Sequence, residues 1–178
     1  MSRVGKIPVI IPPLVNCQFQ ESLISVTGPK GSLSKKFSDL ITFKQEDNKI
    51  IVDTVNTSNK AKTLKGTTRM IFANMVKGVT DGFTSELELN GVGYKAFIVG
   101  KYLSLSINKS HPTKVEIPDD IKITSTKNGG IILECIDKER LGGLVNLIVD
   151  LSPPEPYKGK GIKKVGTFVQ RKEGKKKG

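Results

Sequence analysis

The sequence predicts an α+β protein made of two tandem, duplicated domains, each a small antiparallel or mixed sheet packed on one helix, followed by a basic C-terminal tail. Two observations predict this architecture. Short alternating segments separated by turns give way to a long segment of helical periodicity, and the same order of strands and helix then occurs a second time. We place the domains at residues 1–82 and 83–156, and the tail at residues 157–178.

The first half contains short segments in which apolar and polar residues alternate, as they do in half-buried strands. We expect strands at residues 16–20, 23–27, 32–37, 41–45 and 50–54, with turns between them. The apolar spacing then changes to that of a helix, which we expect to have Asn59 as its N-cap and to stop at Gly82. The first domain is therefore predicted to be a sheet with one long helix lying on it.

The second half repeats this order of elements. We expect strands at residues 85–90, 94–99, 103–107, 113–117, 121–125 and 131–135. A second helix should start at Asp137 and end before Pro153 and Pro154, which cannot continue it. Aligned segments of the two halves share few identical residues, so the repeated order of hairpin, hairpin and helix is what indicates a duplication.

Length and composition favour a globular protein without a membrane partner. A chain of 178 residues with 37% hydrophobic residues can build packed cores. Its N-terminus lacks the apolar region of a signal peptide, and its longest apolar runs are short and interrupted by proline. Cys17 and Cys135 are far apart and have no CxxC neighbour, which fits reduced thiols in a reducing compartment. We expect no metal and no cofactor.

Three local patterns resemble catalytic or cofactor motifs but suit turns better. Residues 91–96 match the GxGxxG/A dinucleotide pattern, yet a strand follows where that pattern needs a helix, so we expect a hairpin turn. His111 is the only histidine; it has no triad partner, and it either contacts a phosphate or base or simply packs in its loop. Asp119 and Asp120 follow a proline, which is typical of turns. We therefore expect no enzymatic activity and no small-molecule substrate.

The excess positive charge is concentrated at the C-terminus. The chain carries a net charge of +12, and residues 157–178 hold nine basic residues against one acidic residue, a net of +8. Just before this segment, Pro153, Pro154 and Pro156 should force an extended entry of the chain. Lysine and glycine then alternate at residues 158–161. Lysines can neutralise phosphates, glycines let a backbone approach closely, and Tyr157 can stack on a base or sugar. The pattern thus predicts RNA binding by a tail that its glycines keep unordered before binding.

A membrane surface is the rival polyanion for such a tail. Binding to a membrane would favour an amphipathic helix with bulky apolar residues, which glycines and prolines do not form. A nucleotide-dependent enzyme using the turn at residues 91–96, and a generic basic adaptor for RNA or for anionic surfaces, are the remaining alternatives.

Six segments of the chain carry a resemblance to a known family: MSRVGKIP at the N-terminus, VTGPKGSL at 26–33, GVGYKA at 91–96, SHP at 110–112, PEPYKGKGI at 154–162 and KEGKK at 172–176. They resemble the bacterial-type large-subunit ribosomal protein number six, over nearly the whole chain. The resemblance implies two duplicated α+β domains and a structural constituent of the large ribosomal subunit that supports translation. It implies large-subunit rRNA and neighbouring large-subunit ribosomal proteins as partners, near the stalk base where translational GTPases dock, in a bacterial cytoplasm or a plastid stroma.

The same resemblance implies where the rRNA is contacted. The expected contact set is Tyr157, Lys158, Gly159, Lys160, Gly161, Lys163, Lys164, Arg171, Lys172, Lys175, Lys176 and Lys177. The loop residues Ser110 and His111, and the N-terminal residues Arg3 and Lys6, are further candidates.

Overall fold

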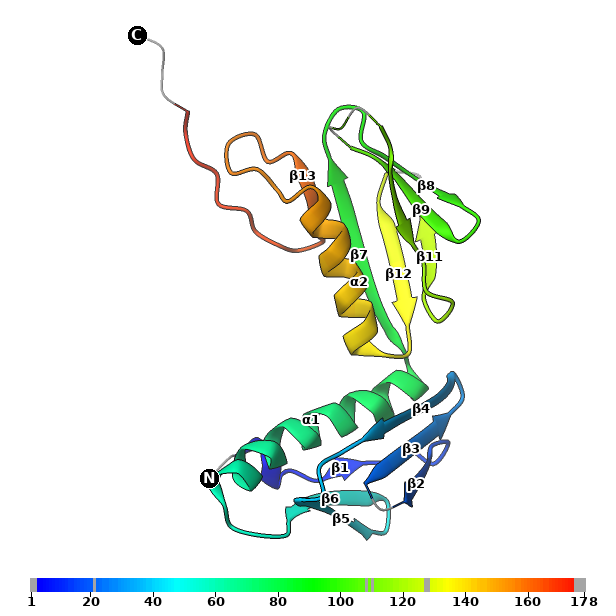
Figure 1. The fold of residues 1–178 in the computed structure, drawn as a ribbon, viewed down its shortest axis with the longest axis vertical. Helices are drawn as coiled ribbons and strands as arrows, with labels where there is room; N and C mark the ends of the chain where they lie inside the picture. The colour runs from blue at the N-terminus through cyan, green and yellow to red at the C-terminus, as the bar shows by residue number, and fades with distance from the viewer. Residues whose placement is uncertain (1–2, 21, 108, 110, 127–128, 175–178) are drawn as a thin grey trace. The chain divides into compact units, whose positions relative to one another are not determined.

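The computed structural model describes residues 3–20, 22–107, 109, 111–126 and 129–174. The chain divides into two compact units, the first formed by residues 1–82 with 136–138 and the second by residues 83–135 with 139–178. Figure 1 shows a long helix in the first unit and a shorter one in the second, each with its own strands. Within the described ranges, no helix is both long and apolar enough to cross a membrane.

The first unit packs the long helix α1 onto two small antiparallel sheets. Its strands pair in the orders β2-β3-β4 and β1-β6-β5. The apolar side of α1, with Phe72 and Val79 fully buried, packs against Ile24, Val26 and Ile50 of the strands. The elements of this unit are η1 (Val4–Lys6), β1 (Val9–Ile10), β2 (Asn16–Gln20), β3 (Leu23–Gly28), β4 (Gly31–Lys36), β5 (Ile41–Glu46), β6 (Lys49–Thr54) and α1 (Asn59–Thr80).

The ends of α1 are fixed by local hydrogen bonds. Ser58 is the N-cap, because its side-chain oxygen accepts a hydrogen bond from the backbone N–H of Ala61 at 3.2 Å. The expectation that Asn59 is the cap is therefore wrong by one residue, since Asn59 is already helical. Gly82 follows the helix as expected: its φ of 74° is left-handed, and its N–H donates to the carbonyl of Lys77.

The second unit also places one helix beside two antiparallel sheets. The strands pair in the orders β10-β9-β8 and β11-β12-β7-β13, and α2 lies beside β7 and β12 in Figure 1. Its core is formed by the fully buried Leu87, Leu103, Leu133, Ile148 and Ile162 and their neighbours. The elements are β7 (Phe83–Asn90), β8 (Lys95–Val99), β9 (Tyr102–Ser106), β10 (Thr113–Glu116), β11 (Lys122–Ser125), β12 (Ile131–Cys135), α2 (Lys138–Leu151) and β13 (Gly161–Lys164).

The two units repeat one topology, which confirms the duplicated α+β fold. The meander β2-β3-β4 corresponds to β8-β9-β10, and the hairpin β5-β6 corresponds to β11-β12. In each unit the strand that precedes the meander pairs with the second strand of the hairpin: β1 pairs with β6, and β7 pairs with β12. The strands of each unit thus divide between two sheets, a detail that the sequence did not indicate.

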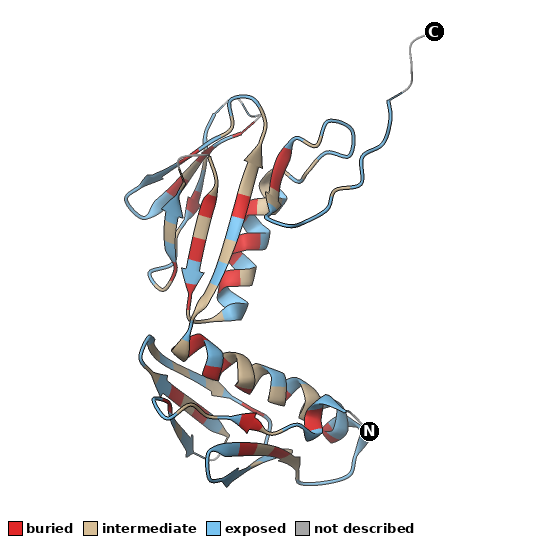
Figure 2. Cartoon of the chain, turned by 180° about the vertical axis from the view of Figure 1, so that it is seen from behind, coloured by how far each residue is buried: buried red, intermediate tan, exposed pale blue. Residues whose placement is uncertain are grey.

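Strand β13 is the main departure from the predicted elements. Residues 157–178 were expected as a tail without order before binding, yet Gly161–Lys164 pair antiparallel with β7, and Ile162 faces Leu89 across the ladder. Ile162 is fully buried, and Figure 2 shows this buried segment at the place of β13. The expectation of an unordered segment is therefore wrong for these residues. A four-residue strand with one apolar side chain shows no periodicity that sequence reasoning could detect.

A close backbone contact fixes the start of β13. Gly161 has a φ of 138°, and a Cβ atom there would lie 2.6 Å from the carbonyl oxygen of Pro153 and 2.7 Å from the Cα of Pro154. Backbone atoms cannot yield as a flexible side chain can. Only glycine therefore fits where the chain leaves α2 and β13 begins.

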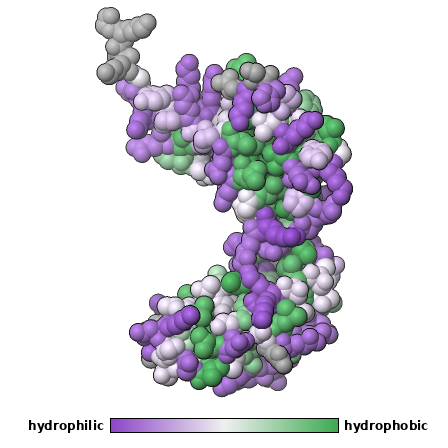
Figure 3. Space-filling model, viewed as in Figure 1, coloured by the Kyte–Doolittle hydropathy of each residue, from purple (hydrophilic) through white to green (hydrophobic). Residues whose placement is uncertain are grey.

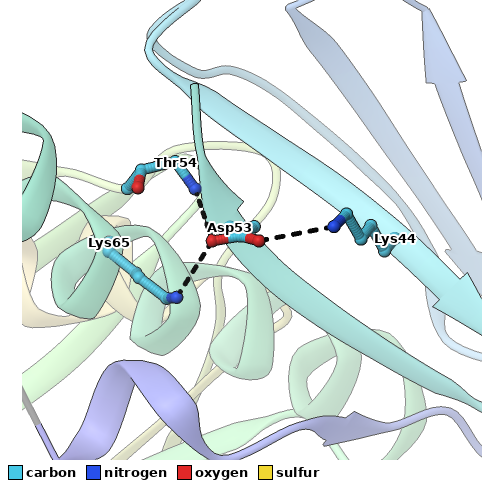
Figure 4. Close-up of polar contacts among 4 residues, drawn as sticks. All are labelled: Lys44, Asp53, Thr54 and Lys65. Atoms are coloured by element: carbon cyan, nitrogen blue, oxygen red, sulfur yellow. Dashed lines mark hydrogen bonds and ion pairs between the residues drawn. The ribbon is translucent and has the colours of Figure 1, made fainter. Parts of the chain in front are cut away.

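In the first unit, Asp53 of β6 contacts the neighbouring strand β5 through Lys44 and the helix α1 through Lys65 (Figure 4). Its carboxylate accepts a hydrogen bond from the backbone N–H of Thr54 at 2.9 Å, and lies 3.2 Å from Nζ of Lys65 and 3.5 Å from Nζ of Lys44. The Thr54 N–H, followed by Lys65, lowers the pKa of Asp53 below its ordinary value. The ionised carboxylate therefore favours the folded state.

We expect Gly161→Ala to lower the free energy of unfolding by about 3 kcal/mol, because the new Cβ would overlap the backbone of Pro153 and Pro154 at a φ that alanine avoids. Urea unfolding followed by circular dichroism measures the loss. Gly142→Ala is the matched control: Gly142 lies within α2 with no heavy atom within 4 Å of its Cβ position. That change should raise the stability by up to about 1 kcal/mol. Equal effects of the two changes would contradict the close contact.

We expect Asp53→Asn to destabilise the first unit by about 0.5–1 kcal/mol at neutral pH, a size set by the solvent exposure of the pairs. Because the folded pKa of Asp53 is lowered, its contribution is present above the unfolded value of about 4 and is lost as the pH falls through the folded pKa. Unfolding curves of the wild type and the variant should therefore converge in acid. The exposed Asp39→Asn serves as control; convergence at alkaline rather than acid pH would refute this account of Asp53.

Candidate nucleic-acid interface

The chain from Ser152 to Gly174 folds back on itself, and we call residues 152–174 the C-terminal clasp. Its first arm, residues 152–160, is a loop closed by two backbone hydrogen bonds. The N–H of Glu155 donates to the carbonyl of Lys160 at 2.7 Å, and the N–H of Gly159 donates to the carbonyl of Glu155 at 3.0 Å. Pro156 stands in the turn where a fixed φ near −65° is favourable. Pro153 and Pro154 precede this turn, in a stretch that is neither helix nor turn.

The second arm of the clasp, residues 165–174, folds back and contacts the first arm. After β13, the N–H of Val165 donates to the carbonyl of Glu86, and further on the N–H of Lys172 donates to the carbonyl of Pro156 at 2.8 Å. The guanidinium of Arg171 lies against Gly159, since a Cβ there would be 3.1 Å from its Nη2 atom. Gly159 also has a φ of 69°, which favours glycine.

The contact between the two arms brings predicted rRNA-contact residues of both arms together in the clasp. Lys158 and Lys160 of the first arm, and Arg171 and Lys172 of the second, are all exposed. Among the described residues, these four cations have no ion-pair partner. Tyr157 is 54% exposed, so part of this residue is accessible to a partner. The surface of this region is mostly hydrophilic in Figure 3.

Lys163 and Lys164 differ from the other clasp cations because they contact their own unit. Nζ of Lys163 lies 3.1 Å from the carboxylate of Glu88 on β7, and Nζ of Lys164 donates to Oδ1 of Asn146 on α2 at 3.0 Å. Both contacts anchor β13. A phosphate would have to compete with them.

The remaining predicted residues lie elsewhere. His111 is an exposed residue of the loop between β9 and β10 in the second unit. Arg3 and Lys6 are exposed beside and within η1 of the first unit. Ser110, Lys175, Lys176 and Lys177 fall outside the described residues. Sequence reasoning also passed over Phe168, an aromatic side chain in the second arm that is 88% exposed.

The turn at residues 91–94 lacks the architecture of a nucleotide site. It is followed by strand β8 and not by the helix whose N-terminus would bind a pyrophosphate in that motif. It is also not a hairpin, which corrects our expectation, because β7 and β8 belong to different sheets. The ring of Tyr94 fills the turn: a Cβ on Gly91 would lie 2.9 Å from it.

The carboxylates of Asp119 and Asp120 bind cationic side chains of their own unit. Asp119 lies 2.7 Å from Nζ of Lys101, which lowers the pKa of this carboxyl group, and Asp120 lies 2.8 Å from the guanidinium of Arg140. Within the part of the chain that the structure describes, no cluster of three or more potential metal ligands occurs. These carboxylates thus stabilise a turn.

Comparison with known proteins decides the family. The family described as ribosomal protein L6 matches residues 11–82 and again residues 90–165. A curated relative, large ribosomal subunit protein uL6 of Magnetococcus marinus, is 44% identical over 177 residues, which cover 99% of this chain and 100% of the relative. The chain belongs to the ribosomal protein L6 family. It is accordingly a structural constituent of the large ribosomal subunit and an rRNA-binding protein that functions in translation.

The two ribosomal protein L6 matches follow the duplication seen in the structure. The first covers β2 to α1, and the second runs from the end of β7 through β13. Strand β13 and the first arm of the clasp are therefore within the repeat that this family shares. The second arm, after residue 165, lies beyond the match.

We expect Gly159→Ala to release the second arm of the clasp, because the methyl group would displace the guanidinium of Arg171. The backbone amide of Lys172, which donates to Pro156, should then exchange with solvent at least about tenfold faster. Gly166→Ala is the control, since Gly166 has a similar φ of 81° but nothing within 4 Å of its Cβ position. Both variants should lose about 1–2 kcal/mol through backbone strain. Unchanged exchange at Lys172 in Gly159→Ala would show that the arms are not coupled in this way.

Proposed function

We propose that the C-terminal clasp is the main rRNA-binding site of this ribosomal protein L6 family member. The observation that supports this most is the junction of the two arms, where Lys172 bonds to Pro156 and Arg171 covers Gly159. It gathers cations from separate parts of the sequence on one folded element. Phosphate groups of RNA are contacted mainly by such lysine and arginine side chains.

The clasp suits RNA better than a membrane surface. It contains a turn, a short strand and an irregular second arm, and no amphipathic helix that could lie in a lipid interface. Exposed Tyr157 adds a flat ring next to Lys158, and aromatic rings stack on unpaired bases. Cations together with a stacking ring are the combination expected of an RNA contact.

The role we infer is positional and not catalytic. The protein would hold rRNA near the stalk base, beside neighbouring large-subunit proteins and the region where translational GTPases dock. Ser110 and His111, and Arg3 and Lys6 of the first unit, are secondary contact candidates in this proposal. A folded clasp with several exposed cations suits such a role because it holds a polyanion without changing it chemically.

Removing the clasp cations should weaken rRNA binding and reduce its dependence on salt. We expect the fourfold variant Lys158→Gln, Lys160→Gln, Arg171→Gln and Lys172→Gln to lower the slope of log affinity against log salt by about 3, from about 0.7–0.9 per lost phosphate contact. Binding of deproteinised large-subunit rRNA, measured by filter retention from low to high salt, gives both affinity and slope. Substitution is cleaner than deletion of residues 157–178, which would remove β13 from the core.

A charge-matched control separates the clasp from general basicity. Lys36, Lys49, Lys60 and Lys62 are exposed in the first unit, and changing all four to glutamine removes the same charge. This control should retain nearly the wild-type slope. If both fourfold variants lose affinity and slope equally, diffuse electrostatic attraction and not the clasp accounts for binding.

A further inference from the structure

Phe168 is the most exposed aromatic side chain among the described residues of the clasp. It is 88% exposed, compared with 54% for Tyr157, while its neighbour Val169 is half-buried. Removing a phenylalanine side chain from water is favourable, yet the folded chain does not bury this one. Single exposed apolar residues are common on protein surfaces, and the setting of Phe168 is what distinguishes it.

The backbone around Phe168 is held on both sides. Before it, the N–H of Thr167 donates to the carbonyl of Lys164 at 3.1 Å; after it, Lys172 bonds to Pro156. Arg171 rests on Gly159 between these points. The ring therefore projects from an anchored segment, so less conformational entropy is lost when it binds a partner than for a ring on a free tail.

The charge around Phe168 identifies the kind of partner. Between residues 156 and 172 there are six cations and no acidic residue. An apolar protein surface would gain little from this charge, whereas RNA offers phosphates to the cations and bases to the ring. We propose that Phe168 stacks on an unpaired base of the large-subunit rRNA, an inference that rests on the proposed function of the clasp.

Substitutions at Phe168 test stacking apart from charge. Phe168→Ala should weaken binding of deproteinised large-subunit rRNA about tenfold, or about 1.4 kcal/mol, and leave the salt slope unchanged, because no phosphate contact is lost. Phe168→Leu should weaken binding almost as much, since leucine is apolar but has no ring. Phe168→Trp should bind at least as tightly as the wild type. Thermal unfolding should be nearly the same in all three, because the ring is exposed.

Tryptophan at this position also reports stacking directly. The chain contains no tryptophan, so Phe168→Trp introduces a single indole. Its fluorescence should be strongly quenched when rRNA is added, whereas Val92→Trp, at a 95% exposed position in the turn after β7, should be quenched little.

The outcomes separate this inference from the proposed function. If wild-type protein binds rRNA without salt dependence, or does not bind, the proposed function itself fails. If the wild type binds as expected but Phe168→Ala binds equally well and the indole is not quenched, only the role of Phe168 fails. Wild-type affinity in Phe168→Leu with a loss in Phe168→Ala would indicate an apolar contact, and would also overturn stacking.

Discussion

At the point where the chain leaves helix α2, the backbone of Gly161 approaches that of Pro153 and Pro154 so closely that no side chain fits between them. This contact fixes the position from which β13 starts. The strand then pairs with β7 and buries Ile162 in the core of the second unit. Both arms of the clasp therefore emerge from a base that is part of a packed domain. The hydrogen bond between Lys172 and Pro156 consequently closes a short loop, which is entropically less costly than ordering a free tail.

A folded clasp changes the energetics of binding a polyanion. A disordered basic tail loses its conformational entropy when it binds, and this loss lowers the affinity gained per contact. Here the cations of both arms already share one element, held by Arg171 against Gly159 and by two intramolecular contacts of β13 lysines. Those two lysines show that positive charge in the clasp has more than one use. Lys163 and Lys164 hold the strand to its own unit, while Lys158, Lys160 and Lys172 remain exposed to solvent.

The sequence predicts well those features that depend on local periodicity. Both helices, most of the longer strands, the stop at Gly82 and the duplication follow from apolar spacing and turn residues. Strand β13 could not be found in this way, because Ile162 is its only large apolar residue and its pairing with β7 is distant in sequence. The division of strands between two sheets, and the connection of β7 to β8 across them, are also long-range properties. In the site, composition revealed the cations, but the contact of Arg171 with Gly159 depends on the folded path of the chain.

The central claim is that the clasp is folded before RNA arrives, and the backbone amide of Ile162 tests it most directly. This N–H donates to the carbonyl of Ser152 at 2.8 Å and lies at the start of β13. Hydrogen exchange should be measured on the full-length protein free of RNA. The account predicts that the Ile162 amide exchanges as slowly as the amides of β12 in the same core. Exchange of Ile162 at the rate of an unstructured peptide, with β12 still protected, would contradict it.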